Sequence, residues 1–239
     1  MIHSHLRAFH VFADTEELHR VRVEVKKIKA FLLLNEKWEE KNEIQKLFKP
    51  VNKLFHKAGK IRSAQVNLEL MEEHDISNPQ MEEEQTAELV LESEKLYARI
   101  NIYLNHFKKS PTVFLREFSD IHNKQVKKIF LGICKELEKM LEGELKTKTL
   151  HDSRKKLKNI LYLMDVVSEK FLDELKMNKE YVKKLEVSIG KWHDITLAIE
   201  LFKKSNADEK MVEHLKSAEE KQLQKIHSLA QHFKKKVNN

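Results

Sequence analysis

Apolar residues recur every three or four positions along almost the whole chain, which is the spacing of one face of an α-helix. Residues that favour turns are scarce, because the 239 residues include four glycines and three prolines. Neither strand-like alternation nor a two-residue hairpin signal is evident. The sequence therefore predicts an all-α protein made of long antiparallel helices.

Capping signals and breaks divide the pattern into predicted helical segments, of which 112–145 reads as one helix or two. The segments are 15–38, 42–71, 79–108, 112–145, 147–171, 179–204 and 208–236. Pro50 should kink or split the second segment, because proline removes a helix hydrogen bond. Residues 1–13 are rich in histidine and weakly patterned, so we expect a frayed N-terminus there.

Several features of the sequence predict a soluble protein of the cytoplasm. The single cysteine, Cys134, cannot form an intrachain disulfide and lies among apolar residues, which is typical of a core position. The N-terminus lacks the cationic start and apolar run of a signal peptide. No apolar run approaches the roughly 20 residues that cross a bilayer.

The chain is densely charged with both signs and has a modest basic excess. Forty-five Lys and Arg residues against thirty-eight Asp and Glu residues give a formal charge of +7. Such an excess favours a polyanionic partner if it is concentrated on one surface, and serves only solubility if it is spread out. The placement of the basic residues therefore matters more than their number.

The first predicted helix carries a row of basic side chains beside its apolar flank. At about 100° per residue, the row falls within an arc of roughly 80°. It consists of His19, Arg22, Lys26 and Lys29, and we call it the first basic row. The next segment continues with Gly59-Lys60-Ile61-Arg62 about forty residues later. A glycine inside a helix costs about 1 kcal/mol relative to alanine, so we expect Gly59 to permit a close helix crossing.

The same pattern returns in the second half of the chain. His151, Arg154 and Lys158, the second basic row, repeat the spacing of the first, and Gly190-Lys191-Trp192-His193 follows at nearly the same interval. This repeat predicts one domain over 14–239 that consists of two helical halves, about 14–110 and 145–239, joined by a helix over 111–144. Two-fold pseudosymmetry would bring both rows around one shared site.

With both copies in view, the sequence resembles the CHAD family, named for a conserved histidine α-helical domain. The matching residues are the two basic rows, Tyr162 and the two glycine motifs, with His193-Asp194 in the second. The resemblance implies two pseudosymmetric bundles around a basic cavity, noncatalytic binding of inorganic polyphosphate and an association with polyphosphate granules. It implies no catalytic residue, metal or cofactor. No fused triphosphate-tunnel domain is present in this chain.

The predicted anion-binding residues share a basic or hydrogen-bonding side chain on the repeated segments. They are His19, Arg22, Lys26, Lys29, Lys60, Arg62, His151, Arg154, Lys155, Lys158, Tyr162 and His193. Arginine offers phosphate paired hydrogen bonds and lysine an adaptable point charge. A neighbouring anion would favour the protonated form of histidine.

Other interpretations of these residues stay open at this point. Either row could be a solvated helix face, His193 a core histidine beside Trp192, and Tyr162 a packing residue. The His-Asp pairs at 74–75, 151–152 and 193–194 could belong to a metal-dependent phosphohydrolase, although cations beside the histidines would repel a metal. A nucleic-acid partner is less expected, because the motifs lack interleaved aromatic residues. A purely structural adaptor would leave the repeated rows unexplained.

Overall fold

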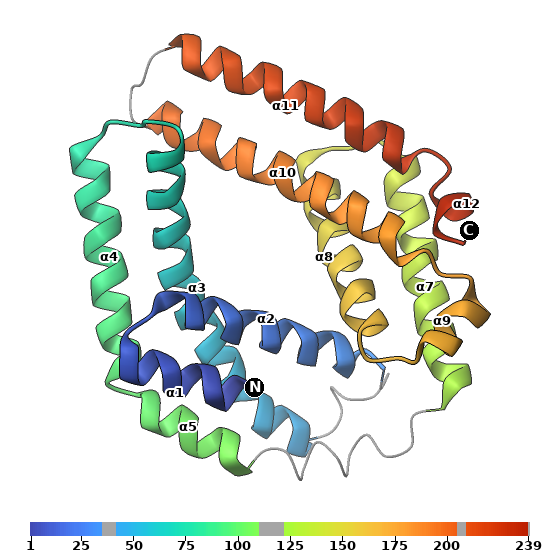
Figure 1. The fold of residues 1–239 in the computed structure, drawn as a ribbon, viewed down its shortest axis with the longest axis horizontal. Helices are drawn as coiled ribbons and strands as arrows, with labels where there is room; N and C mark the ends of the chain where they lie inside the picture. Colours follow the sequence, from blue (N-terminus) through green and yellow to red (C-terminus); the bar gives the residue numbers. More distant parts are fainter. Residues whose placement is uncertain (35–41, 110–121, 205–208, 239) are drawn as a thin grey trace. The chain divides into compact units, whose positions relative to one another are not determined.

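A computed structural model describes residues 1–34, 42–109, 122–204 and 209–238 (Figure 1). Within these ranges every regular element is a helix and no strand occurs, so the all-α prediction is confirmed. The chain divides into two compact units, Met1–Ile121 (unit 1) and His122–Asn239 (unit 2).

Unit 1 contains five described helices that pack around one apolar cluster. They are α1 Ile2–Phe12, α2 Thr15–Leu32, α3 Asn42–Glu73, α4 Pro79–Tyr97 and α5 Ile100–Lys109. Helix α3 lies antiparallel beside α4, and α1 packs against α2 and α5 (Figure 1). The carboxylate of Asp14 accepts a hydrogen bond from the Glu16 N–H at 2.9 Å and caps α2. Val21 and Val25 of α2 are fully buried in the cluster.

Three expectations for unit 1 need correction. The N-terminus is not frayed, because Leu6 and Phe9 bury α1 in the core. Pro50 lies within α3, which continues past it as one helix, so of the two predicted effects of this proline the split is wrong. The segment 79–108 forms two helices, and the break after α4 allows Ile100 and Tyr103 to join the core. Helix α2 ends at Leu32, earlier than the predicted end of the first segment at Trp38, which itself lies outside the described residues.

Unit 2 contains α7 Asn123–Glu142, α8 Thr147–Met164, α9 Glu169–Leu175, α10 Lys179–Lys204, α11 Glu209–Ala230 and α12 Phe233–Val237. Helix α8 packs between α7 and α10, and α11 lies antiparallel beside α10 (Figure 1). Among the described side chains, Trp192 of α10 is the largest that is almost fully buried, and it lies in this unit. The bounds of α10 agree with the predicted segment 179–204.

Two predicted segments of unit 2 are shorter than expected. The segment 147–171 ends as α8 at Met164, and Ser168 caps a separate helix α9 by accepting a hydrogen bond from the Phe171 N–H. The segment 208–236 divides into α11 and α12 where His232 adopts a left-handed conformation. The predicted joining helix over 111–144 lies partly outside the described residues, and α7 forms the described part of it.

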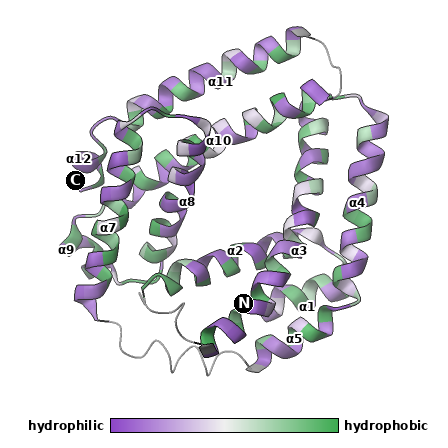
Figure 2. Ribbon diagram, turned by 180° about the vertical axis from the view of Figure 1, so that it is seen from behind, coloured by the Kyte–Doolittle hydropathy of each residue, from purple (hydrophilic) through white to green (hydrophobic). Residues whose placement is uncertain are grey.

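Hydrophilic and hydrophobic residues both occur along the length of the helices, as expected of amphipathic helices (Figure 2). Their apolar sides supply the cores of the two units. Among the helices that the structure describes, none combines the length and the apolar character needed to cross a membrane.

Candidate functional site

The first basic row lies along α2 on the flank next to its buried valines. All four side chains are partly buried. They lie near α3, which packs against α2 and carries the Gly59 motif. The structure therefore brings the row and this motif together within unit 1.

Arg22 lies across the surface of α3 at Gly59. Its Nη1 donates a hydrogen bond of 2.6 Å to the backbone carbonyl of Phe55, and its guanidinium carbon lies 4.3 Å from the centre of the Phe55 ring. Lys29 Nζ lies at the same distance from that ring centre. A Cβ atom at Gly59 would overlap Nη1 of Arg22. The glycine thus makes room for the side chain of Arg22 from α2, the helix that packs against α3.

The cations of unit 1 are close enough to destabilise one another's charged forms. Burial lowers the pKa of Arg22, and the positive charge of Arg62 lowers it further. Burial, followed by the charge of Arg22, lowers the pKa of Lys29. The pKa of His19 is lowered mainly by burial and then by Arg62, although Glu16 opposes this shift. Such mutual repulsion marks a place where an anion would be favoured.

Arg62 lies near His19 and also contacts acidic side chains. Its Nη1 donates to Glu69 at 3.0 Å and lies 3.9 Å from Glu16. Lys60 does not join the first row, because its Nζ lies 3.6 Å from the buried carboxylate of Glu92 on α4. Residues two apart on a helix differ in direction by about 200°, which explains why Lys60 and Arg62 face different neighbours.

The second basic row repeats this arrangement in unit 2. Arg154 of α8 lies across α10 at Gly190, where a Cβ atom would be 3.2 Å from Nη2 of the arginine. His151 meets His193 of α10 with ring centres 4.6 Å apart and the rings nearly perpendicular. Lys155 lies outside this contact, since it is exposed and bonds to Asp152 at 3.1 Å. In each unit an arginine three residues after a histidine therefore passes over a helical glycine.

His193 is not a fully satisfied core histidine. Its Nδ1 is buried and has no hydrogen-bond partner among the described residues, as is also true of Nε of Arg154. Burial lowers the pKa of His193 to about 4, and the charges of Arg154, His151 and Lys158 act in the same direction. His193 is therefore a neutral ring near pH 7, with a buried nitrogen beside a basic cluster.

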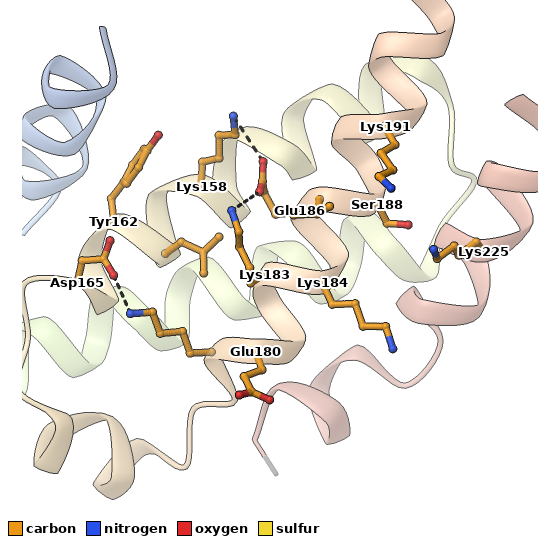
Figure 3. Close-up of a pocket in the computed structure, with 13 residues that line it drawn as sticks. Lys158, Tyr162, Asp165, Glu180, Lys183, Lys184, Glu186, Ser188, Lys191 and Lys225 are labelled. Carbon is orange, nitrogen blue, oxygen red and sulfur yellow. Dashed lines mark hydrogen bonds and ion pairs between the residues drawn. The ribbon is translucent and has the colours of Figure 1, made fainter. Parts of the chain in front are cut away.

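The sequence reasoning missed Glu186, whose carboxylate lies at the centre of the basic cluster of unit 2. The residue is 5% exposed. Its carboxylate lies 3.7 Å from Arg154 Nε. It also lies 3.4 Å from Lys158 Nζ and 3.3 Å from Lys183 Nζ (Figure 3). Burial, followed by the charge of Arg154, lowers the pKa of Lys158, while Glu186 opposes that shift. The sequence did contain a signal for this burial, because Glu186 lies on the same face of α10 as Val182 and Ile189.

A groove of about 850 Å³ in unit 2 runs from α8 over α10 to α11 (Figure 3), and we call it the lysine groove. Six lysines and three acidic residues line it together with Leu161, Tyr162, Val187 and Ser188. The lysines are Lys158, Lys179, Lys183, Lys184, Lys191 and Lys225, and the acids are Asp165, Glu180 and Glu186. Of these lysines, Lys184, Lys191 and Lys225 form no ion pair with a described residue.

The family model described as the CHAD domain matches residues 3–203 of the chain. The chain belongs to the CHAD family. The matched range includes both basic rows and both glycines. The CHAD match ends within α10, so Lys225 and the rest of α11 lie beyond it. No curated protein matches the chain.

The His-Asp pairs of this CHAD chain do not form a metal site among the described residues. Among the side chains that the structure describes, no three from His, Cys, Asp and Glu are grouped so as to hold a metal ion. What the described residues do offer is two clusters of cations, each of which includes an arginine positioned by a glycine. Phosphate oxygens are well suited to such clusters.

Proposed function

We propose that this CHAD-family chain binds inorganic polyphosphate without altering it chemically. The observation that carries the proposal is the repeated placement of an arginine over a helical glycine, beside a histidine and a lysine. Polyphosphate is a flexible chain with a negative charge on every phosphate unit. Its binding needs a series of cations rather than a reaction centre.

The proposal includes the arrangement that the family resemblance implies. In that arrangement the two basic rows line one shared cavity and contact the same polyphosphate chain. Each arginine would bind phosphate oxygens through paired hydrogen bonds, and the lysines would follow the chain with their flexible stems. Association with polyphosphate granules belongs to the same proposal, since a granule presents this ligand at high density.

The first experiment is a calorimetric titration of the protein with polyphosphate of defined length at a low and a high salt concentration. We expect tight binding that weakens steeply with salt, because bound cations release counterions from the polyanion. Electrophoresis of the ligand afterwards should show unchanged chain length. A single-stranded oligonucleotide of equal charge tests the nucleic-acid alternative, and a carboxylate polymer tests binding to any polyanion. GTP with manganese tests the alternative of a metal-dependent phosphohydrolase. Absence of binding, or binding or cleavage only with metal, would reject the proposal.

Binding should be accompanied by proton uptake at His193. In the free protein this ring is neutral above about pH 4, since burial and nearby cations lower its pKa from the usual 6.5. A bound polyanion would offset the positive charges of Arg154, His151 and Lys158 and so raise that pKa. At a pH midway between these values, titrations in two buffers of different ionisation enthalpy should reveal the uptake. The variant His193→Gln should reduce it, and identical heats in both buffers would contradict the expectation.

The same shift predicts how the stability of the free protein varies with pH. The unfolded chain binds a proton at His193 with the usual pKa of 6.5, whereas the folded protein binds it only near pH 4. Between these values the unfolded state holds more protons, so the free energy of unfolding contributed by His193 falls as the pH falls. Denaturant titrations of the wild type and of His193→Gln over this range measure the difference. Equal pH dependence in both proteins would show that His193 does not contribute.

A further inference from the structure

The two units differ at the residue that precedes the motif glycine by four positions. Unit 1 has Phe55 before Gly59, whereas unit 2 has Glu186 before Gly190. Residues four apart on a helix lie on the same face, so both side chains lie beside the arginine that crosses the glycine. One unit therefore offers its arginine an aromatic ring, and the other offers a carboxylate.

In unit 1 the two cations beside Phe55 have no carboxylate partner among the residues that the structure describes, whereas Arg62 pairs with Glu69 and Glu16. Arg22 and Lys29 both lie over the Phe55 ring and form no ion pair with any carboxylate among the described residues. An aromatic face attracts a cation without cancelling its charge. The positive field of this cluster is therefore available to a ligand.

In unit 2 one buried carboxylate is shared by three cations, namely Arg154, Lys158 and Lys183. The separation of 3.7 Å between Arg154 Nε and Glu186 is too long for a hydrogen bond, and Nε is buried without a partner among the described residues. Glu186 thus offsets the charge of the cluster but leaves this donor unsatisfied. An added phosphate oxygen could bind the donor, but it would have to approach a fixed negative charge.

We propose that Glu186 is an internal counter-anion that occupies the place of a ligand phosphate, so that the two units differ in affinity and unit 1 binds phosphate more tightly. This inference rests on the proposed function. A polyanion that binds Lys158 or Lys183 in the lysine groove must draw that lysine away from Glu186, or lie beside the carboxylate. Both routes weaken binding, because like charges repel most strongly where water is excluded.

The test compares an amide with a carboxylate at the same two positions. Glu186→Gln keeps the size of the side chain and removes its charge, and should raise the affinity for defined-length polyphosphate about tenfold, with a steeper salt dependence. Phe55→Glu places a carboxylate beside Arg22 and should lower the affinity about tenfold relative to Phe55→Gln. Glu200→Gln, at an exposed residue of α10 outside the lysine groove, controls for the change in net charge.

Thermal melting separates this role from a merely structural one. Without ligand, Glu186→Gln should melt at a lower temperature than the wild type. Added polyphosphate should raise the melting temperature of this variant more than that of the wild type, because the ligand replaces the lost counter-charge. If polyphosphate binds the wild type but Glu186→Gln binds no more tightly, the inference fails and the proposed function survives. If Glu186→Gln does not fold, equal affinities of Phe55→Glu and Phe55→Gln would overturn the inference. If neither the wild type nor any variant binds polyphosphate, the proposed function fails as well.

Discussion

Replacing Arg22 and Arg154 together by glutamine should lower the affinity for polyphosphate by about a hundredfold or more. Each guanidinium is partly exposed, and the adjacent glycine sets its position. A charge-assisted hydrogen bond is worth about 1.5–3 kcal/mol, and two arginines together account for the expected loss. Calorimetric titration with polyphosphate of defined length measures the effect. The salt dependence should also become shallower, since fewer phosphates are neutralised.

The double variant should remain folded. The apolar residues of α2 and α8 that form the cores, such as Val25 and Leu157, are unchanged and fully buried. Loss of the hydrogen bond from Arg22 to the Phe55 carbonyl costs about 1 kcal/mol. Circular dichroism should therefore show similar helix content and a small decrease in melting temperature. A variant that is folded and binds like the wild type would exclude both arginines from the site.

A matched control removes the same charge elsewhere in each unit. Arg20 is exposed and bonds to Glu17 on its own helix, and Lys146 is exposed beside Glu144. The double variant Arg20→Gln/Lys146→Gln should bind polyphosphate nearly as well as the wild type. The single arginine variants test the shared cavity. If both arginines contact one ligand chain, each single variant should bind the same number of polyphosphate chains per protein with lower affinity. If the arginines belong to separate sites, each single variant should bind fewer chains per protein.

Gly59→Ala should lower the affinity for polyphosphate about tenfold while leaving the free energy of unfolding almost unchanged. The added Cβ overlaps Nη1 of Arg22, so the guanidinium must leave its position over Phe55. Alanine favours the helix by about 1 kcal/mol, which offsets the loss of one hydrogen bond of about the same size. Binding is measured by calorimetry and stability by denaturant titration.

Two other glycines provide the comparison for this prediction. Gly132 of α7 is exposed, and a Cβ there would meet no atom within 4 Å. Gly132→Ala should therefore stabilise the protein by about 0.5–1 kcal/mol with no change in affinity. Gly190→Ala should have an intermediate effect, since its Cβ would be 3.2 Å from Arg154 and a small shift relieves the contact. If Gly59→Ala binds as tightly as Gly132→Ala, the glycine does not position the arginine for the ligand.

The sequence predicted best those elements whose local signals agree with their packing. Helix α10 has a continuous apolar face around Trp192 and charged ends, and its predicted bounds were confirmed. The break between α4 and α5 was missed because no glycine or proline marks it. It follows from the packing of α5 on α1, which is a contact between distant parts of the chain. Helix α1 was missed because histidines separate its apolar residues.

The candidate site was predictable in part for a similar reason. The repeated spacing placed each histidine, arginine and lysine on one helix face, and the structure brings these side chains together within each unit. Glu186 was overlooked because a glutamate within a helix is usually assigned to the solvent. Only the packing of α8 against α10 shows that it is buried among cations. Periodicity describes one helix at a time, whereas a site depends on pairs of helices.

Because Arg22 lies over Gly59, the effect of a substitution at one of these positions depends on the residue at the other, although the two are far apart in the sequence. With a shorter side chain at position 22, the space beside position 59 would be free, and a glycine would no longer be required there. Alanine at position 59 would then be favourable, because it restores helix propensity without a clash. A double-mutant cycle over the two positions should accordingly be strongly non-additive in binding. Across relatives, the arginine and the glycine should be kept or replaced as a pair.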